Sequence, residues 1–117
     1  MDDNILESIK KKLGIDGAGD VFDEDIKISI NTSLMILKQL GIGPKEGFLV
    51  TTGEETWTDF LGDEMVDIPA VKDCVYLRTK LLFDPPTNST LLQSTKELIA
   101  ELEWRLNVAV DPNTTFD

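Results

Sequence analysis

The chain has 117 residues, 41% of them hydrophobic, and its 22 acidic and 11 basic side chains give a formal charge of −11. This length and composition predict one folded domain with a modest core, and the acidic excess argues against binding to nucleic acid phosphates or an anionic membrane surface. The absence of histidine excludes histidine-based catalysis and imidazole metal sites, and a single cysteine, Cys74, excludes an internal disulfide.

Two features of the chain bear on where it works. No apolar run approaches the roughly 20 residues of a membrane span, and the first residues lack the basic region of a secretory signal. We therefore expect a protein with no membrane partner that is made and used in a reducing cytoplasm, or within an assembly built there.

Two N-terminal segments repeat apolar side chains at helical spacing. Ile5, Ile9 and Leu13 share one stripe of a short first helix. Gly14 ends that helix. A second helix begins with Asp23 as its N-cap and runs to about residue 40, and apolar side chains occupy most of its circumference. Such a helix lies at the centre of a bundle or is covered by another subunit.

Acidic residues gather in two loops without the pattern of a metal or catalytic site. An EF-hand register starting at Asp16 needs glycine at position 21 and glutamate at 27, where the chain has Val21 and Lys27. The acidic cluster between residues 54 and 67 has no histidine and no nucleophile motif beside it. We therefore expect no enzyme activity, no metal and no cofactor.

The segment from Pro44 to Asp67 lacks a helical period apart from one turn, which Thr56 or Thr58 can cap. This length is unusual for a loop inside a small bundle. We expect the segment to project from the bundle and to contact neighbouring subunits. The apolar side chains assigned to these contacts are Phe48, Trp57, Phe60 and Leu61.

Two further helices follow. The first has Pro69 in its opening turn and ends before a double proline at 85–86. It carries Cys74 within its apolar set, which predicts an inert core thiol. Asn88 or Ser89 caps the last helix, which runs to Asn107.

Trp104 lies almost opposite the apolar stripe expected on the last helix. That stripe consists of Leu91, Thr95, Leu98, Ile99, Leu102 and Leu106. A large aromatic side chain on the outer face needs a second surface to cover it. Another helix of the same chain or a neighbouring copy could provide that cover, and we expect an adjacent subunit.

The helical period is lost after residue 107, which divides the chain into a helical domain (1–107) and a C-terminal docking tail (108–117). Val108, Val110 and Phe116 are the apolar anchors of that tail. We expect it to be disordered in the free protein and ordered on a partner, although a frayed terminus is the simpler alternative.

Together these elements predict an all-α fold. It is a small helical bundle of about four helices, with a long loop between the second and third main helices and an extended C-terminal tail.

Five short segments occur in an informative order and spacing. They are GDVFDEDI at 19–26, LKQLGIGP at 37–44, WTDFLG at 57–62, LFDPP at 82–86 and LEWRLN at 102–107. Together, in a chain of this size, they resemble the small head-to-tail connector (adaptor) proteins of tailed bacteriophages and prophages. The resemblance extends from the first helix to residues 111–112.

This resemblance implies a structural virion protein. Copies would form a homo-oligomeric ring, commonly a dodecamer, beneath the portal protein in the neck of the virion. The ring would extend the channel, which duplex DNA passes without specific binding, and dock a downstream head-completion or tail protein. Val108, Val110 and Phe116 would then dock to the portal or neck. The family has no catalytic residues, and its members are assembled in the host bacterial cytoplasm.

Two other classes of function remain open. An acidic helical DNA mimic or interaction module, monomeric or dimeric, needs carboxylates arrayed densely on one exposed face. The acidic residues here are spread over loops and helix starts. An enzyme needs a nucleophile, phosphate loop or metal set. The mass of the purified protein in solution and the neighbouring genes distinguish these classes.

Overall fold

The computed structural model describes residues 4–62 and 68–110, with side chains described as far as residue 108. These residues form five α-helices and one 3-10 turn and contain no strand, which confirms the all-α fold. The elements are α1 (Ile5–Leu13), η1 (Asp16–Ala18), α2 (Asp23–Gln39), α3 (Trp57–Leu61), α4 (Ile68–Phe83) and α5 (Ser89–Val110).

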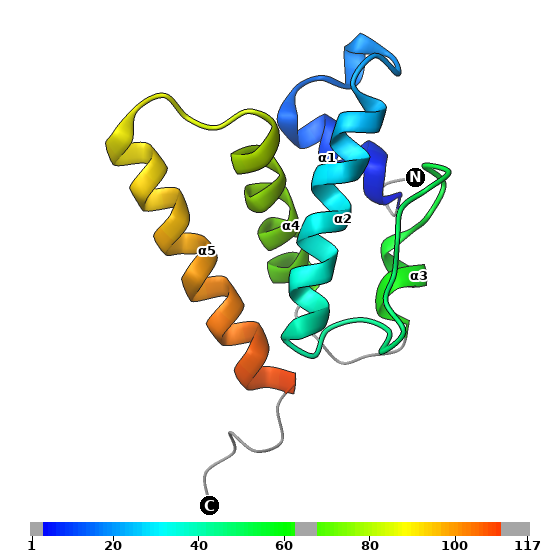
Figure 1. The fold of residues 1–117 in the computed structure, drawn as a ribbon, viewed down its shortest axis with the longest axis vertical. Coiled ribbons are helices and arrows are strands. Elements are labelled where there is room, and N and C mark those ends of the chain that lie inside the picture. Colours follow the sequence, from blue (N-terminus) through cyan, green and yellow to red (C-terminus); the bar gives the residue numbers. More distant parts are fainter. Residues whose placement is uncertain (1–3, 63–67, 111–117) are drawn as a thin grey trace, which may run out of the picture.

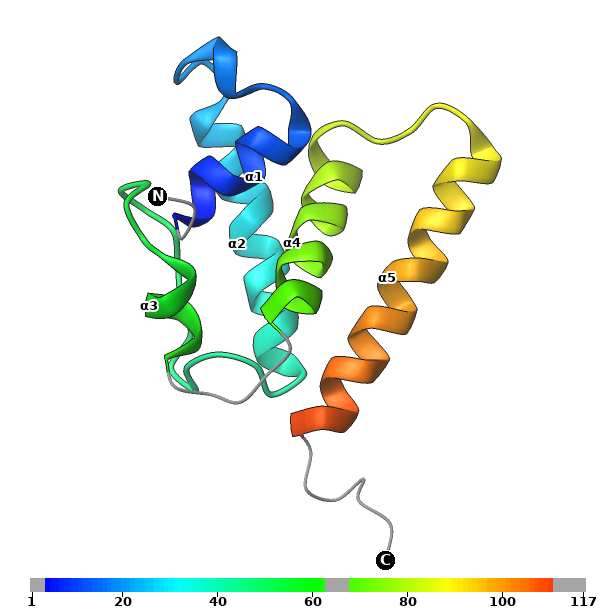
Figure 2. The same cartoon turned by 180° about the vertical axis from the view of Figure 1, so that it is seen from behind.

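Helix α2 is the centre of the bundle (Figures 1 and 2). Its main partner is α4, and α1 packs across both of these helices. The segment that leads into α3 runs along the side of α2 away from α5. Helix α5 packs mainly against α4 and lies at the opposite edge of the molecule. The central position predicted for the second helix is therefore confirmed.

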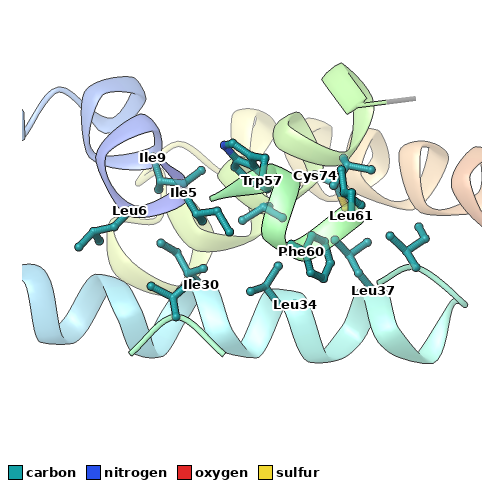
Figure 3. Packing of buried hydrophobic residues seen from close by; sticks show 14 of the residues in the cluster. Ile5, Leu6, Ile9, Ile30, Leu34, Leu37, Trp57, Phe60, Leu61 and Cys74 are labelled. Atoms are coloured by element: carbon teal, nitrogen blue, oxygen red, sulfur yellow. The ribbon is translucent and has the colours of Figure 1, made fainter. Parts of the chain in front are cut away.

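One apolar cluster joins α1, α2, α3 and α4 (Figure 3). In this view the ring of Phe60 points from α3 toward α2. The buried members are Ile5, Leu6, Ile9, Ile26, Ile30, Leu34, Leu37, Ile42, Val50, Trp57, Phe60, Leu61, Val71, Cys74, Val75 and Leu106. Because only Leu106 comes from α5, that helix is attached to the core mainly at its C-terminal end.

Asp23 has a different role from the predicted N-cap. It is the first residue of α2, whose N-cap position is occupied by Phe22 without a side-chain capping bond. The Asp23 carboxylate instead forms an ion pair, at 2.8 Å, with the buried ammonium group of Lys10. The contact with Asp23 raises the pKa of Lys10 although burial opposes this. Lys10 also donates to the carbonyl of Gly19, so it ties α1 to the start of α2.

The expected projection of the Pro44–Asp67 segment is wrong over its described part, residues 44–62. Asn31 of α2 holds the backbone of Val50 on both sides, accepting from its N–H at 2.7 Å and donating to its carbonyl at 3.0 Å. Asn4 donates to the carbonyl of Gly53, and Ile5 N–H donates to that of Glu55. The segment is therefore fastened along the bundle.

The Glu55 carboxylate organises the turn that precedes α3. It accepts bonds from the backbone N–H groups of Thr51, Thr52 and Gly53 and from the hydroxyl of Thr51. Burial alone would raise its pKa, but these donors outweigh burial and lower the pKa to about 2. The ionised carboxylate therefore stabilises the folded loop.

Replacing Glu55 with glutamine should lower the free energy of unfolding by about 1–3 kcal/mol at pH 7, because bonds to a charged acceptor are lost. Since the folded pKa lies below the ordinary 4.5, this contribution is present above that pH and is lost as the pH falls toward 2. Urea unfolding of both proteins across this range measures it. Glu54→Gln is the matched control, because Glu54 is exposed. If the difference in unfolding free energy between the wild type and Glu55→Gln did not change with pH, the stabilising role of the ionised Glu55 carboxylate would be contradicted.

Helix α5 begins as predicted but ends later. Asn88 caps it, accepting from the N–H of Leu91 at 3.0 Å. The helix continues to Val110, three residues beyond the predicted end. Its buried side chains are Ile99 and Leu106, whereas Leu91 and Leu98 of the predicted stripe are exposed.

Candidate functional site

Two surfaces of the described structure carry large exposed apolar side chains that could contact a partner. The first surface lies along α2, where Ile28 and Met35 are 64% and 53% exposed, together with Leu49 of the neighbouring segment. The second is on α5 around Trp104, whereas the exposed Leu91 and Leu98 lie on another side of that helix. Large apolar surfaces of this kind commonly mark interaction sites.

The first surface is an open groove of about 720 Å³, which we call the α2 groove. One wall is the outer face of α2 and the other is the irregular segment at residues 46–49. Its lining residues are Ile28, Asn31, Thr32, Leu34, Met35, Lys38, Glu46, Gly47, Phe48 and Leu49. Ile28 and Met35 are seven residues apart and so lie on the same face of the helix.

Phe48, one of the predicted contact residues, lies in the α2 groove. Its side chain is half-buried, and its ring is 5.4 Å from the ring of Phe60 between centroids. Phe60 thus supports Phe48 from the core side. Part of the Phe48 ring thus stays exposed in the groove, and its contact with another subunit stays a prediction.

Trp104 is 67% exposed in the single chain, so none of the helices in residues 4–62 and 68–110 covers it. Glu97 and Glu101 precede it by seven and three residues and share its side of α5. Glu101 is paired with Arg105 at 2.7 Å. We call this part of α5 the Trp104 face; it is an aromatic side chain with carboxylates beside it.

The prediction that Trp57, Phe60 and Leu61 contact neighbouring subunits from the surface is wrong. They are 2%, 2% and 4% exposed and belong to the core of the single chain. The indole N–H of Trp57 donates to the hydroxyl of Ser8, and the cap provided by Thr56 begins the short helix that carries all three. Because the chain itself covers them, the reason for placing them in a subunit interface is removed.

The predicted docking residues are only partly described. Val108 is a half-buried helical residue, and Val110 lies in the last turn of α5, so neither belongs to an extended tail. Phe116 lies outside the described residues. A docking role for these three residues stays a prediction.

Cys74 is confirmed as a core thiol. It is fully buried, and burial raises its pKa to about 12, which keeps the thiol protonated at neutral pH. The described residues contain no group of three or more potential metal ligands of the histidine, cysteine or carboxylate type. Over the same ranges, no helix has the length and apolar character needed to cross a membrane.

Sequence reasoning missed Ile28, Met35 and Leu49 as surface residues. The signal for the first two was present, because apolar side chains surround most of the second helix. Leu49 carried no comparable signal, since an isolated leucine in a nonperiodic segment points to no particular side of a structure.

Comparison with known proteins identifies the family of the chain. No curated protein and no solved structure matches the chain significantly. The sequence model of the family described as Phage connector protein matches residues 5–113, a range that includes all five described helices. The chain therefore belongs to the phage connector protein family and has a structural, connecting role in the phage particle.

Proposed function

We propose that this chain is the subunit of a connector ring beneath the portal, which extends the DNA channel and docks the next neck or tail protein. The observation that carries the proposal is the presence of two exposed apolar surfaces, the α2 groove and the Trp104 face, on one small subunit. A closed ring with heterologous contacts requires each copy to offer one surface and to receive another.

The acidic charge suits the same role. With a formal charge of −11, a ring of many copies concentrates negative charge around its channel. Such a wall repels phosphates, so duplex DNA passes without being trapped. This role needs no catalytic group.

The proposal is tested with portal-bearing capsids that lack the connector. Purified protein added to them should bind in many copies at one vertex, as a ring visible by electron microscopy. Capsids without a portal are the control. Stable monomers that bind neither kind of capsid would contradict the proposal, and displacement of DNA from a DNA-binding enzyme would favour the DNA-mimic alternative.

We further propose that Val108, Val110 and Phe116 contribute to docking on the portal or neck. Because α5 runs to Val110, the informative truncation ends at that residue and leaves the helix intact. Loss of capsid binding by the truncated chain would support a docking tail. Binding equal to that of the full chain would remove Phe116 from the interface.

A further inference from the structure

We propose that the α2 groove of one copy receives the Trp104 face of the next copy, so that a single contact repeated head to tail closes the ring. This inference rests on the proposed ring and names the two surfaces that build it. It makes a second copy of this chain the occupant of the α2 groove.

The two surfaces lie toward opposite edges of the subunit. In Figures 1 and 2, α5 forms one edge, α4 and α2 follow, and the segment that forms the outer wall of the groove lies beyond α2. Surfaces placed in this way favour a heterologous contact, which leaves a free groove and a free Trp104 face until the ring closes.

The groove and the indole match in apolar character, and the groove is open enough to admit a large side chain. The groove is walled by Ile28, Met35, Phe48 and Leu49 and is open to solvent, with a volume of about 720 Å³. An aromatic side chain buries roughly 150–250 Å² when it is covered. Trp104, at 67% exposure, has the largest side chain among the exposed apolar residues of the described structure.

Charge complementarity selects a second copy as the occupant. Lys38 lines the groove, and Lys45 follows where the chain leaves α2. Within residues 4–62 and 68–108, neither ammonium group has an ion pair. Glu97 likewise has no ion pair there; its carboxylate only accepts a bond from Gln93. The contact would therefore place the two unpaired cations opposite the carboxylate of Glu97, which has no ion pair of its own.

This pairing matters because the subunit is strongly acidic. Two copies with a charge of −11 repel each other over most orientations. An approach that brings Lys38 and Lys45 toward Glu97 and Glu101 reduces that repulsion and sets the orientation. Glu46 also lines the groove, so the cations of the groove have one carboxylate among them.

The test uses two full-length variants that each destroy one side of the contact, Met35→Glu in the groove and Trp104→Glu on α5. Each should weaken self-association at least about 30-fold, because a charge replaces a central apolar group. Sedimentation velocity over a wide concentration range measures this, and the number of copies bound to portal-bearing capsids provides a second readout. Val21→Glu is the matched control, an equally drastic change at a 73% exposed site away from both surfaces.

A mixture of the two variants tests whether the groove and the Trp104 face contact each other, and the wild type separates a head-to-tail contact, which builds rings, from a symmetric one, which stops at dimers. Met35→Glu keeps its Trp104 face and Trp104→Glu keeps its groove, so an equimolar mixture should form dimers but no closed rings. Lys38→Glu and Glu97→Lys should each weaken assembly, and the double exchange in one chain should restore it. Unchanged circular dichroism of each monomer establishes that the variants fold.

Each outcome decides a different point. Rings that persist in both Met35→Glu and Trp104→Glu would overturn this contact and leave the proposed ring standing. A wild-type chain that neither self-associates nor binds portal-bearing capsids would overturn the ring and the contact together. An equal loss of self-association in Val21→Glu would overturn the contact, because the weakening would then not be specific to the two surfaces.

Discussion

Replacing Trp57 with alanine should lower the free energy of unfolding of the monomer by about 3–5 kcal/mol, the usual cost of truncating a large buried aromatic side chain. Trp57 is 2% exposed and packs in the cluster shared by α1, α2 and α4. Its loss would also leave the hydroxyl of Ser8 without the indole N–H that donates to it at 3.0 Å. Urea unfolding of the purified monomer measures the change.

Trp104→Ala is the matched control, because it removes the same side chain from an exposed site. It should change the free energy of unfolding by no more than about 0.5 kcal/mol and should act on assembly instead. The two variants thus separate folding from association. Similar unfolding free energies for both would contradict the assignment of Trp57 to the core.

The helices were predictable because their signals are local. The stripe of Ile5, Ile9 and Leu13 and the stop at Gly14 predict a helix that the structure places at Ile5–Leu13, with Gly14 left-handed at φ 79°. Thr56 or Thr58 is predicted to cap a turn there, and the structure selects Thr56, which forms a complete capping box with Asp59. Each of these features depends on residues within one or two turns of each other.

The position of the aromatic residues was not predictable in this way. Trp57 shares one short turn with Phe60 and Leu61, and Trp104 stands opposite an apolar stripe, so both were assigned to a subunit interface; the first is buried and the second is exposed. The difference comes from contacts distant in sequence, such as the bonds between Asn31 and Val50 that fasten the segment before α3 to α2. No spacing rule within the segment contains that information.

The face of α5 that packs inward was also predicted only in part. The apolar side chains of this helix spread over a wide arc, which is compatible with several orientations. Since α5 packs mainly against α4, only a narrow face around Ile99 and Leu106 is buried. Leu91 and Leu98, at the edge of that arc, stay exposed. The α2 groove was not predicted either, because it forms only where α2 and the segment at residues 46–49 come together.

Gly43→Ala should lower the free energy of unfolding by about 2–5 kcal/mol, through two separate effects. Gly43 has φ of +90°, where an L side chain costs about 1–2 kcal/mol. A methyl group there would also meet the buried ring of Phe60, 2.9 Å from its Cζ atom, and overpacking of this kind adds about 1–3 kcal/mol. Because Phe60 supports Phe48, the α2 groove should be disturbed as well.

Substitutions at two other glycines separate the backbone effect from the overpacking effect. Gly14 also has a positive φ, but a methyl group there has no neighbour within 4 Å, so Gly14→Ala should show the backbone cost alone. Gly17 is free of both constraints, and Gly17→Ala should change the free energy of unfolding by less than about 0.5 kcal/mol. Urea unfolding of all three variants should therefore give the order Gly43, Gly14, Gly17. If Gly43→Ala cost no more than Gly14→Ala, the ring of Phe60 would be free to move aside, and its packing between α2 and Phe48 would not hold the groove in shape.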